Sequence, residues 1–591
     1  MRVTDLMNWG DHVDATLAVP KETKAQRVER LKLAKNPWQA LDEIRAFARR
    51  GRSSVLPEWT SLYFRWWGIY TQGDGAGAVG GSGGEGKSTD YFMFRIRVPN
   101  GILHSNQLRT IADLAERHGR GIADITVRQN IQLHWLTIEA LPEAIDALAA
   151  VGLVTKGACG DVARNLTGCP IAGVAADELC DASPLLLQAA EMLAGNPEFY
   201  NLPRKFKISI TGCPVWCSYP EINDLGFTAV ERTHCGRREI GFSLRVGGGL
   251  SADPHLAARL DAFVRWEQVL PVTRAITELF RDVNVLRDNR KRARMKYLFT
   301  RFDWTPDRFL AELNARLGYR LDPAEPESAP VDVYRDHVGI HRQKQRSAGI
   351  ACEDTLYYIG ASVLRGRITP EQMRGAADLA DRFGSGDLRA TNTQNLLIIN
   401  VPRTNVDAVV RGLDAAGLRV AASPFWRGAI ACTGTEFCKL AITETKAYTR
   451  WLVEELEERL PAFDQHLKLH VTGCPNSCGQ HWISDIGLEG KKIKHAGRMI
   501  DAYYFCLGGA VGEHQRVARP VGYRCPADEV PDAIERLLRS YLASRDGNES
   551  LRSYFARFSD PELRAQLAGF TADAVERDLP TERVPDQVAG D

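Results

Sequence analysis

Four cysteines in the second half of the chain have the spacing of an iron–sulfur site. Cys432 and Cys438, in ACTGTEFCK, are separated by five residues, and Cys474 and Cys478, in TGCPNSCG, are separated by three. Four thiolates in two close pairs suit a [4Fe–4S] cube, in which each iron takes one cysteine sulfur. Structural zinc sites use gaps of roughly two to four residues, so the five-residue gap fits zinc poorly. The spacing therefore predicts a [4Fe–4S] cluster.

The segments that must position these cysteines occur twice along the chain. ISITGCPVWCSYPEINDLGF (208–227) aligns without a gap with LHVTGCPNSCGQHWISDIGL (469–488). TVRQNIQLHWLTI (126–138) resembles ATNTQNLLIINVP (390–402), and RVGGGLS (245–251) resembles CLGGAVG (506–512). Helix and strand patterns alternate through both copies, and LDPAEPESAP (321–330) is the best linker candidate. We interpret this as a duplication whose halves pack around a pseudo-twofold axis, with a ligand at the junction.

The first half carries its own pair of cysteines with three residues between them, Cys213 and Cys217, preceded by Cys159 and Cys169. Nine residues separate Cys159 from Cys169, where the second half has a gap of five. We interpret this group as a vestige of the duplication, and a second cluster is the alternative. The chain contains 13 cysteines. Its N-terminal segment carries Asp5 at a place where a secretion signal would need an apolar run. A disulfide framework is therefore not expected, and a cytoplasmic protein is.

The overall charge excludes some partners. The 75 basic and 74 acidic residues nearly cancel, so no global field attracts nucleic acid or a membrane surface. No stretch reaches the roughly 18 apolar residues of a membrane span. The basic run RDNRKRARMKY (287–297), predicted to be a helix, therefore needs a local acidic partner. GSGGEGKS (81–88) fits the P-loop pattern, but a Gly-rich run precedes it and a strand pattern follows it, so ATP binding is not expected.

The cysteine motifs ACTGTEFCKLAITET and VTGCPNSCG resemble the signature of the sirohaem nitrite and sulfite reductases. The resemblance extends from about Trp38 to about Phe558. It implies two cofactors, sirohaem and a [4Fe–4S] cluster, with Cys478 bridging the cube to the haem iron. It also implies an α+β fold with a duplicated pseudo-twofold architecture, built from ferredoxin-like half-domains and two sirohaem- and [4Fe–4S]-binding α/β domains.

The resemblance and the repeat together predict five segments. They are an N-terminal helical segment with a Gly-rich loop (1–90), the first ferredoxin-like half-domain (91–150), the first sirohaem-reductase domain with an anion pocket (151–320), the second ferredoxin-like half-domain (331–425), and the second sirohaem-reductase domain with the [4Fe–4S] cluster and a helical tail (426–591).

Four cations of the first half match the family's substrate positions. They are Arg95 in FRIRVPNG, Arg164 in CGDVARNLTG, and Lys205 and Lys207 in NLPRKFKIS. Fixed positive charge binds a small oxyanion and polarises its bonds to oxygen, so these residues are the expected catalytic group. Lys205 and Lys207, two residues apart on a predicted strand, project to the same face.

Sirohaem carries many carboxylates, so its site needs basic and polar side chains. These carboxylates are also a suitable acidic partner for the basic run 287–297. The expected cofactor-binding residues, besides Cys478, are Arg128, Gln132 and His134 in TVRQNIQLHW, Asn395 in ATNTQNLLIINVP, and Tyr70 in RWWGIYTQ. We interpret His134 as a pocket residue, because the resemblance gives the proximal iron position to Cys478. Tyr70 and Cys159 resemble positions that form a tyrosine–cysteine thioether in some family members.

The resemblance implies six-electron reduction of nitrite to ammonia with electrons from reduced ferredoxin. No G-x-G-x-x-G stands between a strand and a helix, so no flavin or dinucleotide module is expected. RVPNGIL (97–103) and ARNLTGCPIAG (163–173) look more like nitrite reductases. Lys207, however, stands where plant-type nitrite reductases have asparagine and sulfite reductases have lysine, so reduction of sulfite to sulfide is the alternative. A non-catalytic iron–sulfur electron carrier would explain the four cysteines but not the cationic pocket.

Overall fold

The computed structural model describes residues 22–72, 90–331, 334–344 and 355–570. The P-loop-like segment 81–88 lies outside these ranges. The helices are α1 (Lys24–Ala34), α2 (Leu41–Arg50), α3 (Pro57–Ser61), α4 (Ser105–His118), α5 (Ala140–Ala150), α6 (Ser183–Leu193), α7 (Val269–Asp282), α8 (Lys296–Arg301), α9 (Pro306–Leu317), α10 (Pro370–Phe383), α11 (Val406–Ala415), α12 (Pro424–Gly428), α13 (Lys446–Arg459), α14 (Val530–Ser544), α15 (Leu551–Ala556) and α16 (Asp560–Ala568). Within the described ranges, none of them has the length and apolar character that crossing a bilayer requires.

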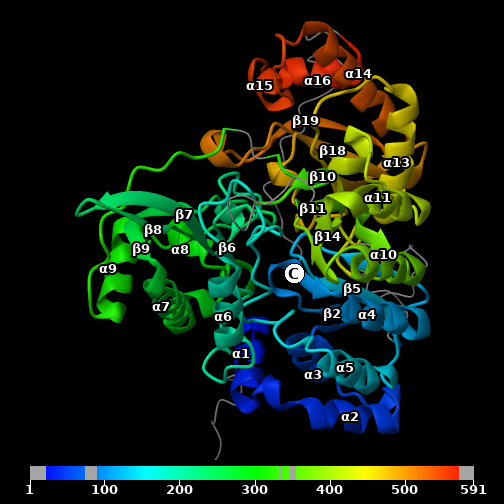
Figure 1. The fold of residues 1–591 in the computed structure, drawn as a ribbon. Helices are drawn as coiled ribbons and strands as arrows, with labels where there is room; N and C mark the ends of the chain where they lie inside the picture. The colour runs from blue at the N-terminus through cyan, green and yellow to red at the C-terminus, as the bar shows by residue number, and fades with distance from the viewer. Residues whose placement is uncertain (1–21, 73–89, 332–333, 345–354, 571–591) are drawn as a thin grey trace, which may run out of the picture.

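Two antiparallel sheets form the centre of the molecule, and each contains one strand from the other half of the chain (Figure 1). The first has the order β1-β2-β5-β4-β12 and the second the order β10-β11-β14-β13-β3. Their strands are β1 (Ile69–Thr71), β2 (Phe92–Ile96), β3 (Ile102–His104), β4 (Ala123–Ile125), β5 (Ile131–Leu136), β10 (Gly339–Arg342), β11 (Leu356–Ala361), β12 (Arg367–Ile368), β13 (Asp387–Ala390) and β14 (Leu396–Pro402). Strand β12 pairs with β4, and β3 pairs with β13, so the two sheets exchange an edge strand.

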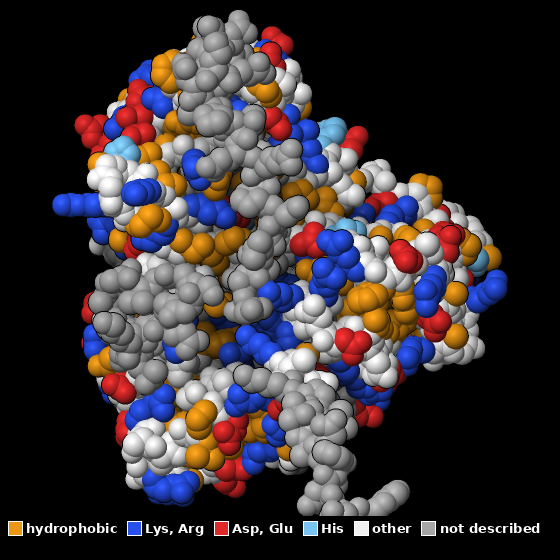
Figure 2. Space-filling view, turned by 180° about the vertical axis from the view of Figure 1, so that it is seen from behind, with side chains coloured by type: hydrophobic (Ala, Val, Ile, Leu, Met, Phe, Trp, Pro, Cys, Tyr) orange, Lys and Arg blue, Asp and Glu red, His pale blue; other side chains and the backbone are white. Residues whose placement is uncertain are grey.

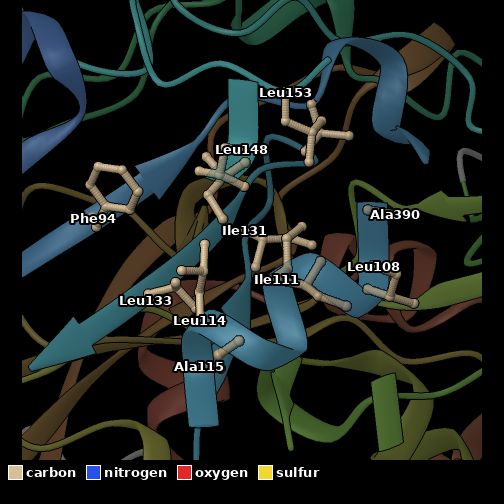
Figure 3. Packing of buried hydrophobic residues seen from close by; sticks show 14 of the residues in the cluster. Phe94, Leu108, Ile111, Leu114, Ala115, Ile131, Leu133, Leu148, Leu153 and Ala390 are labelled. Carbon is tan, nitrogen blue, oxygen red and sulfur yellow. The ribbon is translucent and has the colours of Figure 1, made fainter. Parts of the chain in front are cut away.

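One hydrophobic core spans both of these sheets. It includes apolar side chains of α4, α5 and α10 and of strands from both halves, among them Phe94, Leu108, Leu133 and Ala390 (Figure 3). Helix α4 has apolar residues at Leu108, Ile111, Leu114 and Ala115, three or four positions apart, so they share one buried face. The two halves therefore share a core rather than meeting at a polar interface.

Each half also contributes one mixed sheet that extends from this centre (Figure 1). The first has the order β6-β7-β8-β9 and the second the order β15-β16-β17-β18-β19. Their strands are β6 (Ile208–Thr211), β7 (Leu225–His234), β8 (Arg237–Val246), β9 (Ala258–Arg265), β15 (Ala429–Ala431), β16 (Leu469–Thr472), β17 (Ile486–His495), β18 (Arg498–Leu507) and β19 (Arg519–Pro526). Strand β6 is parallel to β7 as β16 is parallel to β17, so the predicted duplication is confirmed.

The exchange of edge strands depends on a pair of equivalent glycines. Gly101 (φ +68°) and Gly366 (φ +71°) turn the chain into β3 and β12. A Cβ atom at Gly101 would lie 2.0 Å from the backbone oxygen of Ala390, and one at Gly366 would lie 2.4 Å from that of Ile125. Only glycine allows both this backbone conformation and this close approach.

The basic run 287–297 is not the helix that the sequence predicts. It forms two short 3-10 turns, Asn284–Arg287 and Arg290–Arg292, and only its last residues enter α8. The side chain of Asn289 accepts a hydrogen bond from the backbone N–H of Lys291 and starts the second turn. Asparagine favours such local caps over a helix interior, which explains the break.

The glycine at the exchange point gives a test of the shared architecture. Gly101→Ala should lower the thermal midpoint well beyond the effect of Gly152→Ala. Both glycines have positive φ, but a Cβ at Gly152 meets nothing within 4 Å. The control thus isolates the conformational cost, about 1 kcal/mol, from the backbone collision. Thermal unfolding followed by circular dichroism measures the difference, and equal shifts for the two variants would contradict this account.

Candidate active site

The four cysteines of the second half meet at one end of its sheet. Strands β15 and β16 are parallel, and Cys432 follows the first while Cys474 lies just beyond the second. The carboxyl ends of parallel strands share one edge of a sheet, which is where such sheets bind ligands. The backbone N–H of Gly473 donates to Cys432 Sγ at 3.2 Å and ties the two loops together. The loops that carry the two cysteine pairs thus lie side by side, and their role as cluster ligands stays a prediction.

The thiols form one electrostatic group. Burial, and after it the charge of Cys478, raises the pKa of Cys432 and Cys474, and raises that of Cys438 to about 12. Thiols in this state are protonated at neutral pH, whereas bound metal converts them to thiolates. Cys478 is exposed, while its three partners are buried or half-buried. The group therefore presents one sulfur outward.

The loop between Cys432 and Cys438 is held by the first half of the chain. Phe437 stacks on His134 with ring centroids 3.9 Å apart, and Glu436 pairs with Arg367 at 2.9 Å. Both ring nitrogens of His134 have partners, Gln72 and Asp124, each at 3.2 Å. Burial lowers the pKa of His134, so the ring is neutral at pH 7.

Beneath this loop lies a buried carboxylate, Asp124. Its oxygens lie 3.0 Å from Arg367 and 3.7 Å from Lys446. Burial works against its ionisation, but Lys446 and Arg367 hold its pKa well below the ordinary value. Asp124 thus joins β4, β12 and α13 by charge, and it supports His134 under the cysteine loop. The sequence analysis did not single out Asp124 or Arg367, because the partners are more than two hundred residues apart.

The predicted catalytic arginines line the first half of the site. Arg95, on β2, donates to Gln132 Oε1 on β5 at 2.7 and 3.1 Å and to Cys159 Sγ at 3.0 Å. Its guanidinium also lies 5.9 Å from the ring centroid of Tyr70. Arg164 donates to the carbonyl of Gly160 at 2.8 and 3.0 Å. Gln132 and Tyr70, expected to bind cofactor, therefore both contact Arg95.

The two lysines precede a strand rather than lie within it, because β6 begins at Ile208. Between them Phe206 bridges to Ala163 and is fully buried, so both lysines lie on the opposite, half-buried side. Burial, then the charge of Arg294, lowers the pKa of Lys205 to about 7, while Cys478 counteracts this. Burial, then Arg128 and Arg294, holds the pKa of Lys207 well below its ordinary value. Lys205 therefore lies near the exposed thiol of Cys478, and Lys207 lies near the charges of Lys205 and Arg128.

Positive charge is concentrated here beyond what the neighbouring carboxylates balance. Burial, and then repulsion from Arg164, lowers the pKa of Arg128 to about 9, although Asp224 opposes the shift. Asp224 itself is already paired with Arg294 at 2.8 Å. Figure 2 shows Lys and Arg side chains gathered across the middle of one face, where the surface is hollowed beside the lobe that contains β6–β9. Such a group is suited to a ligand with several negative charges.

A family profile described as the nitrite and sulphite reductase 4Fe-4S domain matches residues 159–321 and 423–569. A second profile, the nitrite/sulfite reductase ferredoxin-like half domain, matches residues 85–151 and 352–416. The chain belongs to the nitrite and sulfite reductase family. The expected cofactors, sirohaem and a [4Fe–4S] cluster, are those of this family. The matches follow the predicted order of segments, and the boundaries that we assigned stay a prediction.

Individual relatives of the reductase fall on both sides of the substrate question. This chain is 36% identical over 546 residues to an assimilatory ferredoxin-dependent nitrite reductase of Haloferax mediterranei, and the match covers 87% of this chain and 88% of that one. It is also 36% identical to sulfite reductase [ferredoxin] 1 of Mycolicibacterium paratuberculosis, covering 91% and 95% of the two chains. The solved structure of the Mycobacterium tuberculosis NirA protein superposes with a TM-score of 0.84 at 34% identity, covering 91% of the reductase and 97% of that chain.

One further candidate, Asn395, is engaged in contacts within the protein. Asn395 accepts from the backbone N–H of Val363 at 3.0 Å and donates to Thr393 at 3.3 Å, so its amide orders the turn before β14. Its equivalent in the first half, Asn130, accepts from the backbone N–H of Val98 in the same way. A cofactor-binding role for Asn395, like the thioether between Tyr70 and Cys159, stays a prediction.

The basic run 287–297 pairs chiefly with carboxylates of the reductase itself. Arg287 lies 2.6 Å from Glu29, Arg290 lies 2.6 Å from Asp161, and Arg294 lies 2.8 Å from Asp224. Three carboxylates from distant parts of the chain thus supply these arginines with the acidic partners that the sequence analysis calls for. Carboxylates of the protein therefore pair with these three arginines, and the interaction of sirohaem carboxylates with this run stays a prediction.

The buried carboxylate gives a second test. Asp124→Asn should lower both the thermal midpoint and the amount of iron retained after gel filtration, because it removes the carboxylate beside buried Lys446 and one of the two carboxylates that pair with Arg367. Breaking a buried pair in this way costs about 3–5 kcal/mol. Asp113→Asn is the control, since Asp113 pairs with Arg374 at an exposed position. Iron content and midpoint that match in the two variants would show that the network does not support the cysteine loop.

Proposed function

We propose that this protein is a ferredoxin-dependent nitrite reductase, which reduces nitrite to ammonia by six electrons at a sirohaem coupled to a [4Fe–4S] cluster. One observation carries the proposal: the exposed sulfur of the four-cysteine group faces an excess of buried positive charge. The cysteines alone would suit an electron carrier, and the cations alone would suit any anion-binding site. Their juxtaposition at Cys478 suits a redox centre that acts on an anion.

The residues would divide the work as follows. Cys432, Cys438 and Cys474 would hold the cluster, and Cys478 would be shared between cluster and haem. When bound, the two cofactors supply single electrons and an iron site for the substrate. Arg128 would balance carboxylates of sirohaem, a role that its lowered pKa favours because an added anion relieves the repulsion around it.

The substrate anion would be held by the four cations of the first half. Arg95 is fixed by Gln132 and Cys159, and Arg164 by the carbonyl of Gly160, so both guanidinium groups are oriented before substrate arrives. Lys205, with a pKa of about 7, can give up a proton at neutral pH, which is the property of a general acid. Each reduction step consumes protons, so a donor next to the anion is needed.

Sulfite is the second candidate substrate, and Lys207 favours it. A cation beside Lys205 gains more from a dianion than from nitrite, because Coulomb energy scales with ligand charge. The lowered pKa of Lys207 limits this advantage until a bound anion restores its charge. The relatives named as sulfite reductases keep this alternative open alongside nitrite.

The proposed function is tested by turnover of nitrite and sulfite, measured side by side with reduced ferredoxin. We expect the wild type to show sirohaem absorption and to reduce nitrite with the higher kcat/KM. Cys478→Ser should lose activity towards both anions, because a serine oxygen is a poor ligand to be shared between cube and haem. Cys506→Ser, a buried thiol of β18, is the matched control and should retain turnover. A protein that cannot be loaded with sirohaem contradicts the proposal, and one that strongly prefers sulfite replaces it with the alternative.

The pKa of Lys205 predicts how nitrite reduction depends on pH. The side chain is cationic below about pH 7 and neutral above it, so kcat/KM for nitrite should fall as the pH rises through 7. Lys205→Gln should lower kcat/KM roughly 100-fold at pH 6.5 and flatten the profile, since it removes the titrating charge. Lys24→Gln, an exposed change at the start of α1, should leave the profile as it is in the wild type. A profile that survives in Lys205→Gln would assign the titration to another group.

A further inference from the structure

The first half of the chain has its own group of potential metal ligands. Cys169, Cys217 and His337 are buried, and their ligand atoms all lie within 4.8 Å of one another. Cys213 lies outside this set of three but beside it, because its thiol interacts with the thiols of both Cys169 and Cys217. His337 Nε2 lies 3.4 Å from Cys217 Sγ. None of these four residues belongs to the active site described above.

The pseudo-twofold axis relates this group to the cluster cysteines. Thr167 bridges to Ser209 in parallel in the first half, as Ile430 pairs with His470 in the second. Cys169 follows Thr167 by two residues, and Cys432 follows Ile430 by two residues. Cys213 and Cys217 align in the same way with Cys474 and Cys478, which makes three of the four cluster positions cysteine in both halves.

The fourth position distinguishes the two sites. Cys438 stands six residues after Cys432, and the residue six after Cys169 is Ala175, which has no ligand atom. The place of a fourth ligand is taken by His337, from the segment that leads into β10. The group is therefore not a plain remnant of the cluster site, because a different part of the chain supplies a new donor.

The spacing of the donor atoms favours a single ion over a cube. In tetrahedral zinc, bonds of about 2.3 Å to sulfur and about 2.0 Å to nitrogen place the two donors roughly 3.6 Å apart. The 3.4 Å between His337 Nε2 and Cys217 Sγ agrees with this value. A [4Fe–4S] core stands between its thiolates, so thiols that contact one another leave no room for it.

The surroundings prepare the donors for a metal. His337 is buried, with 2% of its surface exposed, and its Nε2 is directed at the thiol of Cys217. Arg335 lies 3.9 Å from Cys213 Sγ and favours the thiolate form there. Apolar side chains around the cysteines, including Ile171, Tyr358 and Leu397, exclude water from the group.

We propose that Cys169, Cys213, Cys217 and His337 bind one tetrahedral metal ion, for which three thiols and an imidazole select zinc. The site joins the loops after the first-half strands to the beginning of the second half. Tyr358 and Leu397, which pack beside it, lie on β11 and β14 of the second central sheet. The ion would therefore fasten the two halves to each other, at a place separate from the reduction of the substrate.

The test is metal analysis of the purified holoenzyme. Mass spectrometry should find about one zinc ion per chain beside the iron of the cofactors. Cys217→Ser and His337→Ala should each lose the zinc while the haem absorption and cluster iron are kept. Cys506→Ser and His341→Ala are the controls, since neither side chain belongs to the group, and both should retain the zinc. Loss of zinc should also lower the thermal midpoint of the holoenzyme.

A second measurement does not depend on how the variants fold. Wild-type protein in which cobalt(II) replaces zinc should show the intense thiolate-to-cobalt absorption of a tetrahedral sulfur-rich site. Wild-type protein that binds neither zinc nor cobalt would overturn the proposal, as would zinc that persists in Cys217→Ser. Additional iron with acid-labile sulfide that Cys217→Ser removes would also overturn it, in favour of a second cluster. Each of these outcomes leaves the cofactors of the active site, and so the proposed function, separately measurable.

Discussion

The arrangement around the site depends on positive charge that the protein concentrates in its interior. Besides burial, a neighbouring arginine lowers the pKa of each of Lys205, Lys207 and Arg128. For Lys207, one of these neighbours is Arg128 itself. A fold maintains such repulsion only when the rest of the structure holds the groups in place, and here strands of both sheets and the loops between them do so. A bound anion converts this repulsion into attraction. The free energy of folding and the affinity for anions are thus linked, and cofactor and substrate would each stabilise the same region.

The shared core explains how two chemically different groups come to face each other. The cysteines follow strands of the second half, and the cations lie on or before strands of the first. Neither set would face the other if the halves were joined only by a linker. The stack of Phe437 on His134 and the pairing of Arg367 with Asp124 fix the cysteine loop against the first half. Contacts between the halves therefore bring the cysteines opposite the cations, while contacts within each half orient the individual side chains.

Much of this could be predicted from the sequence, because local motifs encode it. The spacing of Cys432, Cys438, Cys474 and Cys478 indicated the cluster, and the repeated segments indicated the duplication. What the sequence did not reveal involves partners far apart in the chain. The run 287–297 reads as a basic helix, yet Arg287, Arg290 and Arg294 pair with Glu29, Asp161 and Asp224, and Asn289 interrupts the helix. His337 was overlooked for the same reason, since no local pattern connects it to cysteines more than a hundred residues earlier.

The exchange of β3 and β12 between the central sheets has a consequence for the history of the chain. In either half alone, the central sheet would lack its last strand and would expose an unpaired edge, which favours aggregation. A single copy of the repeat could complete that sheet only by associating with a second copy and donating the strand to it. A symmetrical dimer with swapped strands is thus the simplest precursor of this fold. Fusing its two subunits freed each copy to diverge, so that one could specialise in binding anions and the other in holding the metal cluster.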